Sequence, residues 1–197
     1  MVTGIVLAAG LSTRMGRPKQ LLPLGGKVVL QLVVEALVGQ VDRVVVVVGH
    51  QADQVAGALA GYGIECVVNP DYCAGMLSSV QAGVRAATGA SAFLICLGDQ
   101  PGLSGQTVAA LLEASRGKAK GIVVPCHAGR RGHPVLLSSA YAAEILALGA
   151  GQGLNAVTRG HPEDTLEVPL PDQGIIEDLD TPADYQRELE RRRTTAR

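Results

Sequence analysis

A glycine-rich, cationic segment near the start of the chain has the residue types that bind phosphate. Residues 6–19 (VLAAGLSTRMGRPK) join an apolar run to a loop with two glycines, a hydroxyl group and the cations Arg14, Arg17 and Lys19. Small residues let main-chain N–H groups approach phosphate oxygens, and cations neutralise the phosphate charge. The segment predicts a nucleoside triphosphate site, although an ordinary glycine-rich turn between a strand and a helix has a similar composition.

The spacing of this segment differs from two common phosphate loops. A Walker A loop requires G-x-x-x-x-G-K-[ST], whereas Gly16 is followed by Arg-Pro and Lys19 comes three residues later. The dinucleotide fingerprint G-x-G-x-x-G is absent as well. The sequence therefore does not favour a dinucleotide-dependent oxidoreductase.

Acidic residues at two other places could complete such a site with a metal ion. Asp99 follows the apolar run 93–97 within the turn Gly-Asp-Gln-Pro, and Asp178 and Asp180 precede the last helical stretch. Mg²⁺ binds one or two protein carboxylates together with substrate phosphates. These aspartates are candidate ligands, with a turn at Asp99 and a helix cap at Asp180 as the structural alternatives.

A polar loop after the third apolar run is the remaining candidate for nucleoside binding. It contains NPDY at 69–72 and GMLSS at 75–79, where a helix begins. The amide of Asn69 and the hydroxyl of Ser79 could bind a base edge or a ribose, but the same residue types are ordinary helix caps.

Composition limits the partners of this chain of 197 residues. A formal net charge of −1 and 3% aromatic residues do not favour nucleic acid or an anionic membrane as a partner. No apolar run approaches the roughly 18 residues that a membrane span requires, and the pattern of a secretory signal is missing. The four cysteines lack metal-binding spacing, so we expect free thiols in a cytoplasmic protein; they are Cys66, Cys73, Cys96 and Cys126.

Apolar runs alternate with helical patterns along the chain. Strands are expected at residues 3–8, 43–48, 64–68, 92–97, 121–125, 135–137 and 165–168. Helices are expected at residues 28–38, 51–60, 77–87, 107–115 and 140–148, with a last helix that starts at Thr181-Pro182. This order predicts one α/β domain over residues 1–197, with a mainly parallel twisted sheet and helices on both faces. We expect the strand at 165–168 to be antiparallel or outlying.

The elements of such a fold would bring the polar segments together. Ligands of doubly wound sheets bind at the carboxyl ends of the strands. The loop after residue 8, the turn at Asp99 and the loop at Asn69 all fall at those ends. They are therefore expected to form one site.

Five segments carry a resemblance to a known family. They are, in order, LAAGLSTRMGRPKQLLPLGGKVVL, NPDYCAGMLSSVQAG, CLGDQPGLS, GRRGHPVLL and EDLDTPADY. Together they resemble the MobA-like nucleotidyltransferases, and among them the molybdenum cofactor cytidylyltransferases, over almost the whole chain. The resemblance implies a Rossmann-like fold of the nucleotide-diphospho-sugar transferase type. It also implies Mg²⁺-dependent transfer of CMP from CTP to the terminal phosphate of molybdopterin, with release of pyrophosphate.

The resemblance further implies roles for individual residues. Those expected to contact the nucleotide are Leu7, Ala8, Ala9, Gly10, Ser12, Arg14, Lys19, Asn69, Ser79 and Asp99. The catalytic residues would be Arg14, Lys19 and Asp99, and the metal would bind Asp99 with either Asp178 or Asp180. Those expected to contact the acceptor are Gln100, Pro101, Arg131, Gly132 and His133, although His133 taken alone is more typical of a structural turn.

Two features bear on the substrates. The resemblance links the turn Ala8-Ala9-Gly10 with pyrimidine use, whereas guanylyl-transferring members of the family tend to have a second glycine there. A methyl group at that position would crowd the base pocket, so CTP is expected rather than GTP. The segment GQGLNA at 151–156 stands where the family pattern has GDxGAR, so an acid and an arginine on the acceptor side are replaced by neutral residues. Another phosphorylated acceptor therefore stays open. So does a chaperone that binds the molybdenum cofactor and delivers it to a client molybdenum hydroxylase.

Overall fold

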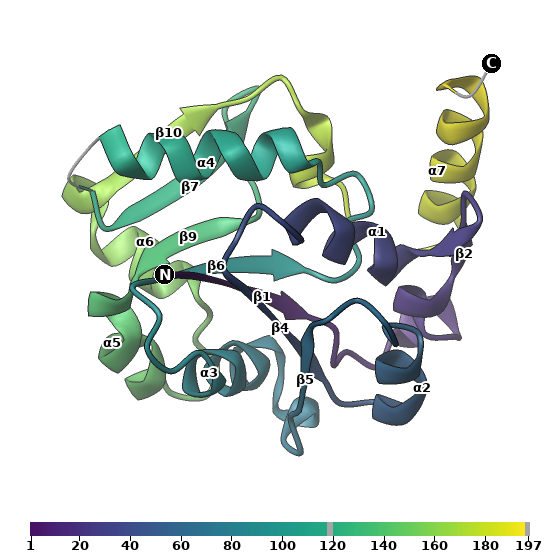
Figure 1. The fold of residues 1–197 in the computed structure, drawn as a ribbon, viewed down its shortest axis with the longest axis horizontal. Helices are drawn as coiled ribbons and strands as arrows, with labels where there is room; N and C mark the ends of the chain where they lie inside the picture. Colours follow the sequence, from purple (N-terminus) through teal and green to yellow (C-terminus); the bar gives the residue numbers. More distant parts are fainter. Residues whose placement is uncertain (118–119, 196–197) are drawn as a thin grey trace.

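The computed structural model describes residues 1–117 and 120–195, which form an eight-stranded sheet with helices on both faces (Figure 1). The order along the sheet is β10 (Thr165–Pro169), β7 (Ile122–His127), β9 (Val135–Ser138), β6 (Ala92–Leu97), β1 (Val2–Leu7), β4 (Arg43–Val48) and β5 (Glu65–Val68). A short strand, β8 (Arg130–Arg131), pairs with β7. Most neighbours are parallel, and β9 is antiparallel to β6 and β7.

The apolar residues of the sheet are covered on both faces. Val44, Val46 and Val48 pack in one core cluster, while Val45 and Val47 pack in the other. The first cluster includes residues of α1 (Val29–Leu37), α2 (Ala52–Gly57) and α4 (Gly105–Gly117). The second includes residues of α3 (Met76–Ala86), α5 (Ala142–Ala147) and α6 (Asn155–Gly160). An unbroken run of valines thus forms a strand buried between two layers of helices, as the sequence predicted.

The centre of the sheet brings two of the predicted loops together. Leu7 at the end of β1 lies beside Val47 of β4 and Leu97 of β6, and all three strands are parallel. Gly98 N donates to Leu7 O at 3.0 Å, and a Cβ atom at Gly98 would lie only 2.8 Å from that oxygen. The chain leaves β1 toward β4 while β6 lies on the opposite side, which is the topological switch point where ligands bind.

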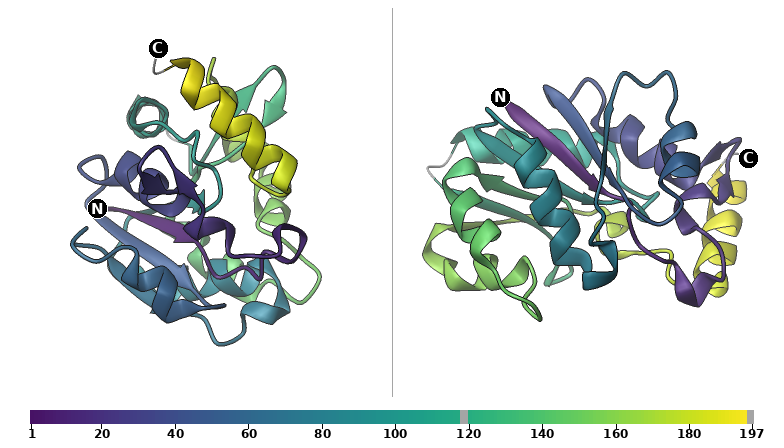
Figure 2. Two further views of the ribbon diagram at one scale, coloured as in Figure 1. Left: turned by 90° about the vertical axis from the view of Figure 1, so that its right-hand side faces the viewer. Right: turned by 90° about the horizontal axis from the view of Figure 1, so that it is seen from below.

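The last helix packs against the hairpin that follows the first loop. α7 (Pro182–Thr195) lies beside the hairpin of β2 (Pro23–Leu24) and β3 (Lys27–Val28), as Figures 1 and 2 show. Tyr185 of α7 packs in a small apolar cluster with Leu24 of that hairpin. The helix begins as the sequence predicted, because Thr181 N donates to Asp184 Oδ2 at 2.6 Å and Asp184 N donates to Thr181 Oγ1 at 3.3 Å.

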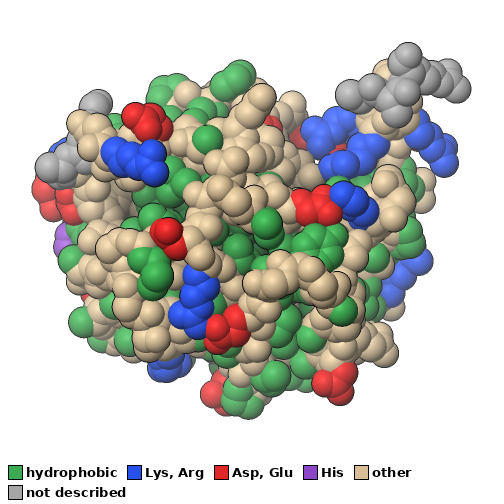
Figure 3. All heavy atoms as spheres, viewed as in Figure 1, with side chains coloured by type: hydrophobic (Ala, Val, Ile, Leu, Met, Phe, Trp, Pro, Cys, Tyr) green, Lys and Arg blue, Asp and Glu red, His purple; other side chains and the backbone are tan. Residues whose placement is uncertain are grey.

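Charges on the surface are largely paired. On the face shown in Figure 3 both signs are interspersed, and cations gather near α7. The arginines of this helix contact nearby acids, among them Arg187 with Asp184 and Arg192 with Glu188 at 2.6 Å. None of the helices in residues 1–117 and 120–195 combines the length and the apolar character needed to cross a bilayer. All four cysteines are free thiols.

Three features differ from the sequence prediction. β10 is the outlying strand that the sequence predicted, at the edge of the sheet and parallel to β7, but the antiparallel direction of β9 between β6 and β7 was not predicted. β7 extends past the strand expected at residues 121–125 and includes Cys126, because the end of β7 pairs with β8. α6 was not predicted, since the glycines and β-branched residues around it have low helix propensity.

A tyrosine–carboxylate contact anchors the chain after α6. Tyr141 Oη donates to Asp164 Oδ2 at 2.5 Å, and Gly121 N donates to Asp164 Oδ1 at 2.9 Å. The two hydrogen bonds lower the pKa of Asp164, while burial and this bond raise the pKa of Tyr141 to about 12. The folded-state pKa of Asp164 thus lies below its unfolded value of about 3.9. Its ionised form adds stability above that value, and this stability is lost as the pH falls through the folded-state pKa.

Removing the phenol should therefore have a pH-dependent effect. We expect Tyr141→Phe to lower the free energy of unfolding by about 1 kcal/mol at neutral pH. The difference should shrink once the pH is below the folded-state pKa of Asp164. Urea unfolding at a series of pH values measures both effects, and an equal difference at every pH would contradict the assignment.

Candidate active site

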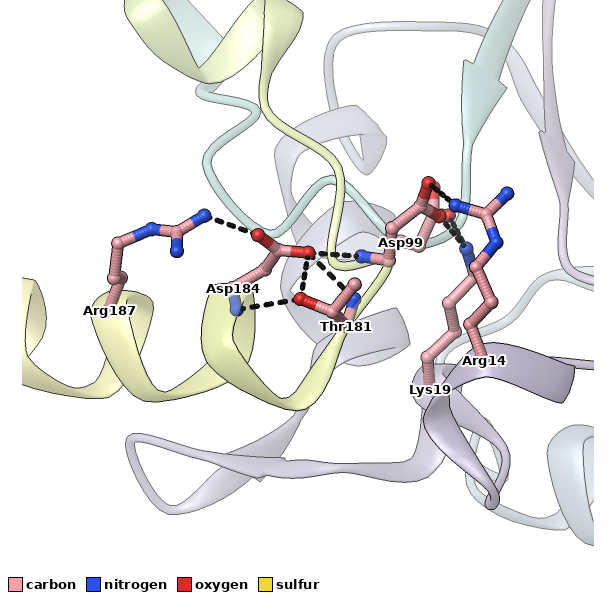
Figure 4. Close-up of polar contacts among 7 residues, drawn as sticks. Arg14, Lys19, Asp99, Thr181, Asp184 and Arg187 are labelled. Atoms are coloured by element: carbon pink, nitrogen blue, oxygen red, sulfur yellow. Dashed lines mark hydrogen bonds and ion pairs between the residues drawn. The ribbon is translucent and has the colours of Figure 1, made fainter.

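Two cations and two carboxylates meet at the carboxyl ends of β1 and β6. Lys19 Nζ forms an ion pair with Asp99 Oδ2 and a second, at 3.0 Å, with Asp180 Oδ1. Arg14 Nη1 lies 2.7 Å from Asp180 Oδ2 (Figure 4). The side chains of Lys19 and Asp99 are only 16% and 14% exposed. We call Arg14, Lys19, Asp99 and Asp180 the ionic cluster.

Main-chain and amide hydrogen bonds hold the three segments of the cluster together. Leu179 N donates to Asp99 O at 3.0 Å, which ties the chain before α7 to the turn after β6. Gln100 is buried, and its Nε2 donates to Asp178 Oδ1 at 2.7 Å. Asp178 is thereby oriented by Gln100, whereas Asp180 faces Lys19 and Arg14.

The aspartates before α7 experience opposite environments. Burial raises the pKa of Asp178, as do the charges of Asp99 and Asp180, against the hydrogen bond from Gln100. The hydrogen bond from Lys19 lowers the pKa of Asp180, and burial does not offset it. Burial alone would lower the pKa of Lys19, but the two carboxylates outweigh it, so this pKa is raised. Lys19 is therefore a cation held between the carboxylates of Asp99 and Asp180.

A cavity of about 320 Å³, here called the β1 cavity, opens beside the ionic cluster. Six residues predicted to contact the nucleotide line it: Leu7, Ala9, Gly10, Lys19, Ser79 and Asp99. Further lining residues, for which no role was predicted, are Leu11, Gln20, Tyr72, Cys73, Gly75, Met76 and Leu97. Four of these, Tyr72, Cys73, Gly75 and Met76, belong to the motif NPDYCAGMLSS. The motif therefore indicated which segment forms the cavity wall, but not which of its side chains face the cavity.

Four other predicted nucleotide residues do not line the β1 cavity. Ala8 lies behind its wall, only 1% exposed. Ser12 closes the loop, because its Oγ accepts a hydrogen bond from Lys19 N at 3.2 Å. Arg14 lies outside, in the ionic cluster. Asn69 is buried and its Nδ2 donates to Ser79 Oγ at 3.0 Å, so this amide orients Ser79 instead of facing the cavity.

A second cavity of about 340 Å³, here called the α6 cavity, contains three of the predicted acceptor residues. These are Arg131, Gly132 and His133; the other lining residues are Met76, Val124, Val135, Gly153, Leu154, Asn155, Thr158 and Arg159. Met76 lines both cavities, so they adjoin at its side chain. Burial lowers the pKa of His133, and the charge of Asp99 opposes this effect.

Two residues predicted to contact the acceptor lie elsewhere. Gln100 is buried and bonded to Asp178, so it positions a carboxylate. Pro101 borders α7, where its carbonyl accepts a hydrogen bond from Arg192 Nη2 at 2.7 Å. Neither residue lines the α6 cavity.

All residues that line the two cavities lie within one known domain. The sequence matches the MobA-like NTP transferase domain over residues 4–166. The chain belongs to the MobA-like NTP transferase family. Its mostly parallel sheet is that of the nucleotide-diphospho-sugar transferase fold, and its activity class is nucleotidyltransferase.

Relatives of this MobA-like transferase carry more than one name. Nicotine blue oxidoreductase from Paenarthrobacter nicotinovorans is 35% identical over 188 residues, covering 91% of this chain and 92% of that protein. Molybdenum cofactor cytidylyltransferase from Escherichia coli K12 is 31% identical over 183 residues, covering 92% of each. The crystal structure of Rv0371c from Mycobacterium tuberculosis in complex with manganese is 32% identical, with a TM-score of 0.78 over 96% of this chain and 98% of that one.

The ionic cluster of the MobA-like transferase has the donor chemistry of a divalent metal site. Asp99, Asp178 and Asp180 offer carboxylate oxygens, the ligands that Mg²⁺ prefers. The ammonium group of Lys19 bridges Asp99 and Asp180, so these two carboxylates are already arranged to share a cation. Within the described residues no group of three or more His, Cys, Asp and Glu side chains forms a metal cage. The donor set therefore fits an ion that takes its other ligands from phosphate and water.

One glycine is required by the wall of the α6 cavity. Gly132 N donates to Pro125 O and His133 N donates to Ile175 O, both at 2.9 Å. A Cβ atom at Gly132 would overlap the main-chain carbonyl of Ile175. We expect Gly132→Ala to lower the free energy of unfolding by about 1–3 kcal/mol in urea unfolding. Gly57→Ala is the control, because open space surrounds Gly57, and equal stability of the two variants would contradict the packing described here.

Proposed function

We propose that this MobA-like transferase moves CMP from CTP to the phosphate monoester of a molybdopterin-type acceptor, with Mg²⁺ bound. The observation that carries the proposal is the ionic cluster, because Lys19 and Asp99 line the β1 cavity and this cavity adjoins the α6 cavity at Met76. Donor and acceptor would therefore meet at these charges. The E. coli relative, named a molybdenum cofactor cytidylyltransferase, supports the choice of substrates.

In the proposed reaction an acceptor phosphate oxygen attacks the α-phosphorus of CTP in line. The new P–O bond forms as the bond between the α-phosphorus and its bridging oxygen breaks, and pyrophosphate leaves with the electron pair. A phosphate monoester is already anionic near neutral pH, so the attack needs no strong general base. Positioning and charge neutralisation then supply the catalysis, as in other phosphoryl transfers.

The residues of the ionic cluster would divide this work. Arg14 and Lys19 would neutralise the charge on the leaving pyrophosphate. Asp99 and Asp180 would hold the metal ion, because these two carboxylates share the Lys19 ammonium in the structure. A bound divalent ion supplies charge neutralisation at the α-phosphate. Asp178, bonded to the buried Gln100, would support the other two aspartates.

The side chain at residue 9 should influence the choice of nucleotide. The methyl group of Ala9 lines the β1 cavity, whereas Ala8 is buried behind the wall. We expect Ala9→Gly to raise kcat/KM for GTP relative to CTP by about 10-fold or more, the effect of one methyl group in a snug pocket. Ala8→Gly is the matched control. An unchanged GTP/CTP ratio in Ala9→Gly would contradict this role.

The proposal is tested by following pyrophosphate with each of the four ribonucleoside triphosphates, Mg²⁺ and extracted molybdopterin. We expect release with CTP, release only in the presence of acceptor, and one CMP transferred for each pyrophosphate. Release that does not depend on the acceptor, or no release with any triphosphate, would overturn the proposal. A chaperone that only binds and delivers the cofactor would bind the acceptor but release no pyrophosphate.

Redox chemistry is the second candidate, because a relative 35% identical to this chain is named an oxidoreductase. The paired opposite charges of the ionic cluster suit a polyphosphate with a metal ion, and the dinucleotide fingerprint is absent. These features favour transfer of a nucleotide. Oxidation of NADH or NADPH by the purified chain in the presence of a dye acceptor, without pyrophosphate release, would favour the redox activity.

A further inference from the structure

The α6 cavity has the charge of an anion site. Two guanidinium groups, Arg131 and Arg159, line it, and no carboxylate is among the lining residues. Burial lowers the pKa of His133, so the imidazole adds no positive charge at neutral pH. Much of the remaining wall is apolar, with Met76, Val124, Val135 and Leu154. A cavity of this kind suits a ligand with an apolar ring body and an anionic group.

The two arginines differ in how free they are to bind an anion. Arg131 Nε and Nη2 both lie 2.7 Å from Glu167 Oε1, so part of its charge is already neutralised. Arg159 is exposed, and no carboxylate of residues 1–117 or 120–195 forms an ion pair with it. Arg159 is therefore the cation of this cavity that still needs an anionic partner.

The position of Arg159 is fixed by the packing of α6. Val157 of this helix is fully buried in the core and Thr158 is nearly so. The residues spaced three and four apart, Asn155, Thr158 and Arg159, all reach the cavity wall. The neutral segment 151–156, which lacks the arginine of the family pattern, ends one helical turn before Arg159. Arg159 can therefore supply the positive charge that this segment lacks.

We infer that Arg159 binds the phosphate group of the acceptor and selects phosphorylated over dephosphorylated acceptors. The inference rests on the proposed function for the identity of the acceptor. The planar guanidinium can donate two parallel hydrogen bonds to phosphate oxygens. Arg131, held by Glu167, borders the same group, while the apolar wall contacts the ring system.

A pair of fluorescent probes tests the inference without requiring turnover. The probes are a pterin carrying a phosphate monoester and the same pterin without the phosphate. Each is titrated into the full chain in the absence of both Mg²⁺ and CTP. We expect the wild type to bind the phosphorylated probe about 10-fold or more tightly than the other, the contribution of one charge-assisted contact. Arg159→Ala should lose this preference and bind both probes equally. Arg159→Lys should keep part of it.

Controls separate this effect from misfolding and from the proposed reaction. Arg116→Ala removes an exposed arginine of α4 that pairs with Glu113, and it should keep the preference. Cys73 is exposed and lines the β1 cavity. If CTP with Mg²⁺ protects this thiol from an alkylating reagent in every variant, the donor side is folded in each of them. Equal binding of both probes by the wild type, or an unchanged preference in Arg159→Ala, would overturn the inference. A wild type that prefers the phosphorylated probe but transfers no CMP would overturn the proposed function and leave this inference standing.

Discussion

Asp99→Asn is expected to lower kcat for CMP transfer by a factor of about 10²–10³, the usual cost of losing one charge-stabilising group. The amide keeps the shape of the side chain but removes the negative charge that pairs with Lys19 and would bind the metal ion. The main-chain bond from Leu179 N to Asp99 O does not depend on the side chain. The variant should therefore fold, and its thermal unfolding curve serves to check this.

Rate measurements at saturating CTP and acceptor give the result. Asp53→Asn, on the exposed side of α2, is the matched control and should keep the wild-type rate. A folded Asp99→Asn variant with more than half of the wild-type kcat would remove Asp99 from the catalytic machinery.

Lys19→Ala should also reduce kcat by about 10²–10³, because no other buried cation stands between Asp99 and Asp180 among the residues that the structure describes. The substitution should change the pH profile as well. The hydrogen bond from Lys19 is the main reason that the pKa of Asp180 is low, so this pKa should rise when Lys19 is removed. Asp180 would then be protonated at a higher pH, and residual activity should be lost at a higher pH than in the wild type.

The control for Lys19→Ala is Lys27→Ala, which removes a more exposed lysine paired with Glu35. Rates of both variants across the acid range show whether the acid limb moves in Lys19→Ala alone. A shift of the acid limb to lower pH, or wild-type rates in Lys19→Ala, would contradict the role given to this side chain.

The ionic cluster could be predicted in part, because position along a parallel sheet is encoded locally. The runs of β1 and β6 are apolar enough to be recognised as buried strands, and polar residues at their carboxyl ends must lie at one edge. Lys19 and Asp99 were therefore expected in one site. That Asp180, and not Asp178, contacts Lys19 depends on the bond between Leu179 and Asp99, which joins residues far apart in sequence.

Hydrogen-bond partners of buried polar side chains could not be predicted. Asn69 and Gln100 both stand in motifs at strand ends, which made them candidates for contact with substrate. The structure uses both to orient a neighbour, Ser79 in one case and Asp178 in the other. A polar side chain looks the same in sequence whether its partner is a ligand or another residue.

The direction of strand β9 and the presence of helix α6 are the parts of the fold that the sequence did not predict. Strand β9 is apolar like its neighbours, and no local pattern distinguishes an antiparallel strand buried on both faces from a parallel one. α6 is held by the burial of Val157, not by its own propensity. Arg159 was overlooked for this reason, since its importance follows from the face of a helix that the sequence did not predict.

The ionic cluster and a divalent ion are proposed to bind the triphosphate together. Calorimetry tests this proposal by measuring the affinity of the wild-type chain for CTP, once with Mg²⁺ and once with EDTA. We predict that CTP binds about 10-fold or more tightly with Mg²⁺, and that Asp99→Asn loses this difference. Equal affinity of the wild type for CTP with and without Mg²⁺ would contradict a metal-assisted triphosphate site at Asp99.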